Sequence, residues 1–400
     1  MALRTDLLIL FVAAVAAALL FSKRVRESPS WIATVTPLAS IIGSGFLVVV
    51  PLLGREEGAW APASMLGIVL VAYAIGAVIR HNIRHVEPRL AAEHPPVWLV
   101  AGERLADVAL VTGYLISVTF YLRILAAFLL QGLGTNGTFR ERLVTSAILV
   151  GIGVVGRLRG LRGLERLEEL SVTAKLAVIA ALLSGLALYD VDGALARLIE
   201  LPTGPRLGPW EQMRVLGGML LVVQGFETSR YLGADYSAET RIATMRRAQW
   251  IAGSVYVVFV FLALPLIPDL PSKIDETAII DLSGHVATVL PSMLIFAAVM
   301  SQFSAAVADT IGAGGLVPDV SRGRVTQRWA YVGIVIAALV LNWTAQIFEI
   351  IALASRAFAL YYLLQCALAF GVTRSPLRRV GIAMLGALLL FVVLFAVAAG

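Results

Sequence analysis

The sequence predicts an all-α polytopic membrane protein, with one membrane domain over residues 1–400. Of its 400 residues, 59% are hydrophobic and 14% are charged, and the mean hydropathy is +0.87. A soluble domain usually carries about 25% charged residues. Apolar runs of roughly 20 residues, the length that spans a bilayer, recur along the chain. Too little polar surface remains to cover a water-soluble globule.

Twelve spans are predicted. Their ranges are 6–21, 31–52, 60–79, 105–132, 142–157, 167–189, 214–234, 247–267, 287–311, 329–343, 346–370 and 378–399. The first run resembles the core of a signal peptide, but one cation precedes it and three follow it. That charge order favours a retained helix whose amino end lies outside.

Loop charges predict the orientation. One set of alternate loops holds 21 Lys and Arg residues, and the opposite set, both termini included, holds 8. Loops rich in Lys and Arg stay in the cytoplasm, so both termini are predicted to lie on the outer side of the membrane. The membrane is expected to be the cell (inner) membrane.

Two five-helix units repeat along the chain. Gly43-Ser44-Gly45 interrupts one span, and Gly225-Phe226-Glu227 interrupts another 182 residues later. The spans after each interruption follow at offsets of 179 to 187 residues. An odd number of helices inverts the second unit relative to the first, and paired inverted units with broken helices are typical of transporters. The predicted segments are 1–29 (extra helix), 30–190 (first repeat), 213–371 (inverted repeat) and 372–400 (last helix).

The two interruptions are the strongest candidate binding elements. Glycines leave the backbone permissive, and unwound peptide groups at membrane depth are tolerated only where they face a cavity or ligand. Close helix packing through small residues is the alternative explanation. Glu227 is an ionisable group within a span, and such groups mark pathways or form structural ion pairs, here with Arg123 as a candidate partner.

Lys175 is the most informative single residue because it lies about nine residues inside a span. A buried ammonium needs carbonyls or anions to hold it, unless the side chain snorkels to the interface. Tyr114, Ser117 and Tyr121 share one helix face, which indicates either a cavity wall or ordinary packing. Glu349 and Arg356 share a face and are expected to pair.

These motifs resemble the amino acid–polyamine–organocation (APC) superfamily of transporters. The family carries a G-S-G break in helix 1 and a G-x-E break in helix 6, and the likeness spans most of residues 31–370. A loop with acidic residues and then cations follows the second break, here Asp235, Glu239, Arg241, Arg246 and Arg247. Two departures stand out. Gly314 occupies the place of an acid at the end of helix 8, and the usual N-P dipeptide after helix 6 is missing.

The resemblance implies a role for each candidate residue. Sodium-coupled relatives hold a sodium ion between helix 1 and helix 8, and other members of the family have a helix 5 lysine in its place. Lys175 matches that lysine, so it should bond the Gly43 region and a hydroxyl of helix 8. Ser301 is the first candidate for this hydroxyl and Ser304 the second. Glu227 should act in an inner gate or in proton sensing. The substrate carboxylate should meet the helix 1 break and its amine the helix 6 carbonyls. The implied substrate-binding residues are Ile42, Gly43, Ser44, Gly45, Leu221, Gln224, Gly225, Phe226, Tyr114 and Ser117.

The sequence therefore favours a secondary transporter of an amino acid or related amine, proton-coupled or uncoupled rather than sodium-coupled. A same-fold transporter of an inorganic ion or nucleobase remains an alternative, as does a membrane sensor or channel. No enzyme motif, metal spacing, cofactor motif or nucleic-acid partner is indicated. The expected partners are the solute, protons and membrane lipid.

Overall fold

The computed structural model describes residues 2–43, 45–135, 137–161, 165–189, 201, 207–233, 236–271 and 275–397, and all regular elements in these ranges are helical. The helices are α1 (Ala2–Leu20), α2 (Lys23–Arg26), α3 (Pro29–Ile41), α4 (Phe46–Glu57), η1 (Gly58–Trp60), α5 (Ala61–His85), α6 (Glu87–Leu90), α7 (Val97–Gly132), α8 (Thr138–Leu158), α9 (Glu165–Leu188), α11 (Pro209–Gly218), η3 (Leu220–Val223), η4 (Phe226–Leu232), α12 (Ala238–Leu262), η5 (Leu264–Asp269), α13 (Ala278–Val286), α14 (Leu290–Val320), α15 (Gln327–Thr344), α16 (Ile347–Val372) and α17 (Pro376–Phe395). The η elements are short 3₁₀ helices.

Helix occurs in each of the twelve predicted ranges. By length and apolar character, six described helical runs could cross a membrane: Phe46–Leu90, Val97–Gly132, Leu170–Leu188, Leu290–Val320, Ile347–Val372 and Pro376–Phe395. The interrupted ranges cannot qualify as single helices, because α3, α4 and α11 have only 13, 12 and 10 residues. The count of twelve spans stays a prediction.

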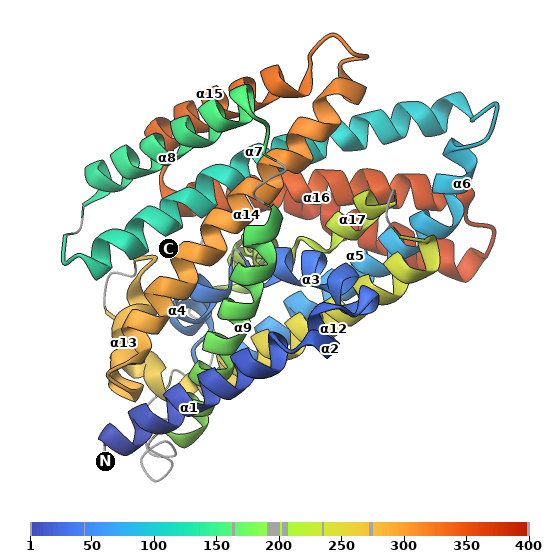
Figure 1. Cartoon of the computed structure of the whole chain (residues 1–400). Helices are drawn as coiled ribbons and strands as arrows, with labels where there is room; N and C mark the ends of the chain where they lie inside the picture. Colours follow the sequence, from blue (N-terminus) through green and yellow to red (C-terminus); the bar gives the residue numbers. More distant parts are fainter. Residues whose placement is uncertain are drawn as a thin grey trace.

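α7 and α14 are the central helices and cross in the middle of the molecule (Figure 1). In α7, 83% of the most apolar window is buried, compared with 17% in α17. α8 and α15 lie side by side on one flank, and α17 lies against α16 on another (Figure 1). Helices α3, η4 and α14 meet near the centre, where the candidate site is found.

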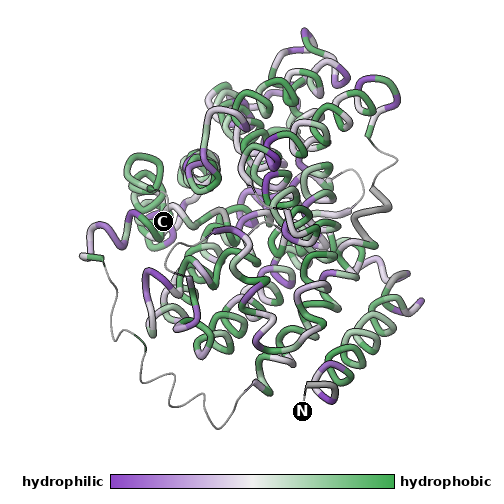
Figure 2. Tube along the Cα trace, turned by 90° about the vertical axis from the view of Figure 1, so that its left-hand side faces the viewer, coloured by the Kyte–Doolittle hydropathy of each residue, from purple (hydrophilic) through white to green (hydrophobic). Residues whose placement is uncertain are grey.

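The extra helix α1 is fastened to the rest of the bundle. It lies along α9, and its tube is mostly hydrophobic at the edge of the molecule (Figure 2). The Asp6 carboxylate accepts hydrogen bonds from the Thr288 backbone N–H (2.9 Å) and hydroxyl (2.5 Å), just before α14 begins. Ile9 is fully buried, and a Cβ at Gly185 would lie 2.9 Å from it. α1 thus connects α9 and α14.

The expected pair of Glu349 and Arg356 is wrong. Glu349 closes a capping box with Gln346 at the start of α16. The Arg356 guanidinium donates instead to the carbonyl of Ala396, at the end of α17. Helix termini leave backbone donors and acceptors unpaired. The start of α16 therefore binds the Glu349 carboxylate, and the end of α17 binds the Arg356 guanidinium, so the two side chains do not pair with each other.

Candidate functional site

The first interruption separates α3 from α4. The last turn of α3 ends at Ile41, and α4 begins at Phe46. The Gly43 carbonyl accepts a hydrogen bond of 2.7 Å from the Gln302 amide of α14, so a side chain replaces a lost helical bond. Ser44 lies outside the described residues.

The second interruption lies after α11, between the two 3₁₀ helices η3 and η4. Gly225 has φ +115°, a conformation that residues with a Cβ rarely adopt. Glu227 and Thr228 follow at once and fold back on it. The Thr228 hydroxyl donates to the Gly225 carbonyl at 2.7 Å, and the Gly225 N–H donates to the Glu227 carboxylate at 3.0 Å.

The two interruptions interlock at their glycines. A Cβ added at Gly225 would overlap the Ser40 side chain, and one added at Gly45 would overlap Val222. The Tyr256 hydroxyl lies between the two interruptions, 3.0 Å from the Ile41 carbonyl and 2.7 Å from the Val222 carbonyl. Close contact of the two backbones is therefore the physical reason for both glycines.

Lys175 reaches the end of α3. Its ammonium donates to the Ala39 carbonyl at 2.9 Å, and the residue is buried, with 6% of its surface exposed. The snorkelling alternative is thereby excluded. The bonded carbonyl lies one turn before Gly43, whose own carbonyl is held by Gln302, a residue that sequence reasoning missed. Ser301 and Ser304 line the same cavity as Lys175.

Glu227 is fully buried and is held by neutral donors. Its Oε2 accepts from the Tyr362 hydroxyl at 2.7 Å as well as from Gly225, and the Phe226 ring stacks on Tyr362. The alternative pairing with Arg123 is wrong. That guanidinium lies 3.6 Å from Glu141 and donates to the Asn342 carbonyl.

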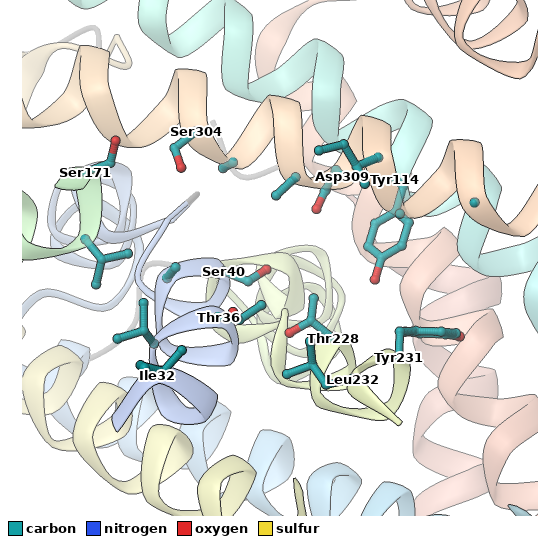
Figure 3. Close-up of a pocket in the computed structure, with 18 of the residues that line it drawn as sticks. Ile32, Thr36, Ser40, Tyr114, Ser171, Thr228, Tyr231, Leu232, Ser304 and Asp309 are labelled. Carbon is teal, nitrogen blue, oxygen red and sulfur yellow. The ribbon is translucent and has the colours of Figure 1, made fainter. Parts of the chain in front are cut away.

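A cavity of about 750 Å³ lies between α3, α9, η4 and α14, with Tyr114 of α7 at its side (Figure 3). Exposed residues mark its mouth, namely Ile32 of α3, Tyr231 of η4 and Asp319 at the end of α14. On the other side of the first interruption, residues 46–54 of α4 are all buried. The cavity therefore opens towards the side of the loops with the most cations.

The cavity takes in four of the residues predicted for the site: Tyr114, Lys175, Ser301 and Ser304. The break residues Ile42, Gly43, Gly45, Gln224, Gly225 and Phe226, and also Ser117 and Glu227, are outside its lining. Their backbones contact each other or neighbouring helices, which closes the space between them. The side chain of Leu221 is outside the described part of the structure.

Sequence reasoning missed the α3 face of the cavity and the part of the α14 face beyond Ser304. On α3 these are Thr36 and Ser40, four residues apart, and on α14 Asp309 continues the row from Ser301 and Ser304. A stripe of polar and small residues at spacings of three and four on two apolar helices was the available signal. The hydroxyls of Ser171 and Ser301 are buried with no hydrogen-bond partner among the described residues, which leaves them available to a ligand.

A buried ionic network fixes η4 beside the cavity. The Arg230 guanidinium lies 2.9 Å from Glu103 of α7 and 3.5 Å from Glu87 of α6. Glu87 also accepts two hydrogen bonds from Arg241 of α12, at 3.0 and 2.7 Å. Since a buried charge needs such partners, the network ties four elements together at one end of the molecule.

In the described part of the chain, no group of three His, Cys, Asp or Glu side chains could hold a metal ion. The cavity walls offer hydroxyls, aromatic rings, one ammonium and two carboxylates. Such a lining can bind and release a polar solute.

Known proteins share this sequence pattern and fold. A family model described as an APC superfamily transporter matches residues 23–397. An uncharacterised protein of Aquifex aeolicus (strain VF5) is 42% identical over 374 residues, which cover 91% of this chain and 90% of that one. A solved structure of Mhp1, a nucleobase-cation-symport-1 family transporter in a closed conformation with bromovinylhydantoin bound, matches with a TM-score of 0.52. That match covers 88% of this chain and 78% of the other at 14% identity, so it establishes likeness of fold alone.

Proposed function

Because the chain belongs to the APC superfamily of transporters, we propose that it is a secondary active transporter that moves a small solute by alternating access. The chain is a multi-pass membrane protein. The proposed membrane is the inner membrane, with twelve spans and both termini outside, as the loop charges indicate.

One observation carries this proposal: the cavity ends against Ser40 and Thr228, beside the two interlocked helix interruptions, and its exposed lining residues lie on one side of them. A carrier needs a central site that is exposed to one side at a time. Interrupted helices at the end of the cavity supply flexible points about which such a site changes its exposure. In the two inverted five-helix units, 30–190 and 213–371, helices α3, α5, η4 and α12 would then rock as a bundle against the remaining helices.

Lys175 supports coupling without sodium. Its ammonium already supplies a positive charge beside the carbonyls at the end of α3 and the α14 serines. A sodium ion at that place would be repelled by the fixed cation. Glu227, at the second interruption, would serve as the inner gate or proton sensor, since protonation would change its bonds to Gly225 and Tyr362.

The proposed substrate is an amino acid or related amine. The cavity lining has two carboxylates, Asp309 and Asp319, and many hydroxyls, which suit an amino group. The break residues around Gly43 and Gln224 would join the site when α3, η4 and α12 move together relative to α14.

Counterflow in proteoliposomes tests the function. Vesicles with purified protein are loaded with an unlabelled amino acid or amine and given a radiolabelled trace of the same compound. We expect accumulation for at least one compound, unchanged when Na⁺ is replaced by K⁺. Single-channel currents without counterflow for any amino acid, amine, nucleobase or inorganic ion would overturn the proposal.

A further inference from the structure

We propose that the end of α5, the short helix α6 and the start of α17 together bind the phosphate group of an anionic phospholipid. The binding surface, called the basic patch, consists of His81, Arg84, His85, Arg89 and Arg378. None of these residues lines the cavity, so the inference goes beyond the proposed transport function. The patch lies in two of the cation-rich loops, 80–104 and 374–379, which are predicted to be cytoplasmic.

Three segments of the chain bring the basic patch together. The His81 and His85 rings lie one turn apart on α5, with 4.4 Å between their centroids. The Nε2 atom of His81 is 3.0 Å from the hydroxyl oxygen of Thr373, the residue that follows the end of α16. The three arginines of the patch all lie within electrostatic range of both histidines. Figure 1 shows α6 and the connection between α16 and α17 at the same end of the molecule.

The corner between α5 and α6 is fastened to α16. The side-chain amide of Asn82 donates hydrogen bonds to the side chain and to the backbone carbonyl of Gln365, at 2.8 and 2.9 Å. A small buried hydrophobic cluster also joins this corner to α16, and its members are Val86, Leu99, Leu368 and Val372. The basic patch is therefore a fixed surface, and little of the chain has to be ordered when an anion binds.

No carboxylate neutralises the basic patch in the described part of the chain. The charged groups that act on the two histidines are all basic. Glu87, which begins α6, is engaged instead by Arg230 and Arg241 of the buried ionic network. The three arginines of the patch are exposed and repel one another, so an anion that lies between them relieves the repulsion.

The first turn of α17 adds uncharged donors to the basic patch. The Ser375 side chain makes no hydrogen bond to this turn, and Pro376 has no N–H group. The backbone N–H groups of Leu377 and Arg378 therefore have no partner within the helix, and such a helix start favours a phosphate. Guanidinium and backbone N–H donors together suit the oxygens of a phosphate group.

Exposed apolar side chains beside the basic patch favour a lipid over a free phosphate ion. Leu377, next to Arg378, is 82% exposed. The half-exposed Trp98 ring lies on α16, because a Cβ added at Gly371 would be only 2.6 Å from it. Tryptophan is enriched at the level of the headgroups, where a ring contacts acyl chains on one side and water on the other. A phospholipid uses both the charges and the apolar border, whereas a soluble phosphate uses the charges alone.

Thermal unfolding of the purified full chain in detergent provides the first test. Phosphatidylglycerol, phosphatidylcholine with the same acyl chains, and inorganic phosphate are added separately. We expect phosphatidylglycerol alone to raise the midpoint in a dose-dependent manner. Arg84→Gln combined with Arg378→Gln should raise the half-maximal concentration roughly 30-fold, which corresponds to about 1 kcal/mol for each arginine. Arg324→Gln combined with Arg328→Gln removes two exposed cations elsewhere and should leave it unchanged.

Equal stabilisation by the two lipids would overturn the inference, as would an unchanged dose response in the Arg84 and Arg378 double variant. Equal stabilisation by inorganic phosphate and phosphatidylglycerol would show a soluble ligand and refute the lipid.

Tryptophan fluorescence in liposomes keeps the inference testable if the double variant fails to fold. Brominated acyl chains quench a nearby indole ring, so brominated phosphatidylglycerol should quench the unmodified protein more than brominated phosphatidylcholine at equal content. Trp98→Phe should abolish that difference, and Trp329→Phe, an exposed tryptophan on α15, should not. Equal quenching by the two lipids in the unmodified protein would refute the site. These readouts need no transported solute, so their failure leaves the transport function standing.

Discussion

The ammonium of Lys175 lies 2.9 Å from the carbonyl oxygen of Ala39, and this bond joins α9 to the last turn of α3. Val35 and Ala39 of α3 also pack against Val172 of α9, and the bond lies at the wall of the cavity. A change in the position of α3 would therefore strain or break this bond. Since α3 forms a wall of the cavity, access of a solute to the cavity is linked to the position of the Lys175 charge.

Replacing the lysine tests that link. Lys175→Met keeps the apolar stem and removes the charge, so uptake should fall at least tenfold, the effect of losing a charged hydrogen bond of roughly 1.5–3 kcal/mol. Initial uptake rates in proteoliposomes, corrected for inserted protein, provide the measurement. Lys23→Met, at an exposed position, is the control. Uptake at the normal rate in Lys175→Met would refute the role.

Gly225→Ala should disturb the interlock of the two interruptions. The new Cβ would overlap Ser40, and φ +115° disfavours any side chain, at a cost of about 1–3 kcal/mol. Both the midpoint of thermal unfolding and uptake should fall. Gly67→Ala in α5 is the matched control, because its Cβ meets open space and helix propensity should favour alanine. Identical midpoints for the two variants would contradict the steric explanation.

Tyr362→Phe isolates the hydroxyl that holds Glu227. The ring still stacks on Phe226, but the buried carboxylate loses its side-chain donor and keeps the Gly225 N–H. We expect a loss of about 1–3 kcal/mol of stability and a changed pH profile of uptake. Tyr73→Phe controls for loss of a tyrosine hydroxyl elsewhere. A pH profile that matches the unmodified protein would argue against Glu227 as a proton-sensing group.

The ionic network around Arg230 lends itself to a double-mutant cycle. Arg230→Met leaves Glu103 without its partner in a buried site and should cost about 3–5 kcal/mol. Combining it with Glu103→Met removes both charges and should recover much of that loss. Denaturant unfolding of the two single variants and the double variant measures the coupling. Strictly additive effects would show that the pair is not coupled.

Glu276 predicts a pH dependence of stability. Burial raises the pKa of this carboxyl, in the loop before α13, from 4.5 to about 7, and the Glu141 and Asp275 carboxylates add to the effect. The folded state therefore holds the proton more tightly than the unfolded state, so stability should fall as pH rises from 4.5 through 7. Glu276→Gln should flatten the midpoint over that range, and the exposed Glu239→Gln should not. An unaltered slope in Glu276→Gln would refute this assignment.

The sequence predicted the helix positions and both interruptions, because apolar runs and paired glycines are local signals. The burial of Lys175 predicted that its ammonium would find carbonyls or anions, and the family resemblance implied that these lie near the first interruption. It did not reveal the cavity, which is built from single faces of α3, α9, η4 and α14. It also placed the binding residues at the glycines themselves. Gly225 has no side chain, so its backbone is free to adopt an unusual conformation and also lies in direct contact with Ser40. This contact leaves no room for a solute between the two interruptions in this conformation.

The Tyr256 hydroxyl has a single proton to share between the carbonyls of Ile41 and Val222. Two chain segments from opposite halves of the sequence thus depend on one phenol of α12. A motion that pulled them apart would leave at least one carbonyl unsatisfied in an apolar surrounding, whereas a rotation of all three together would not. The crossing point therefore holds these three segments together, and they should move as one body.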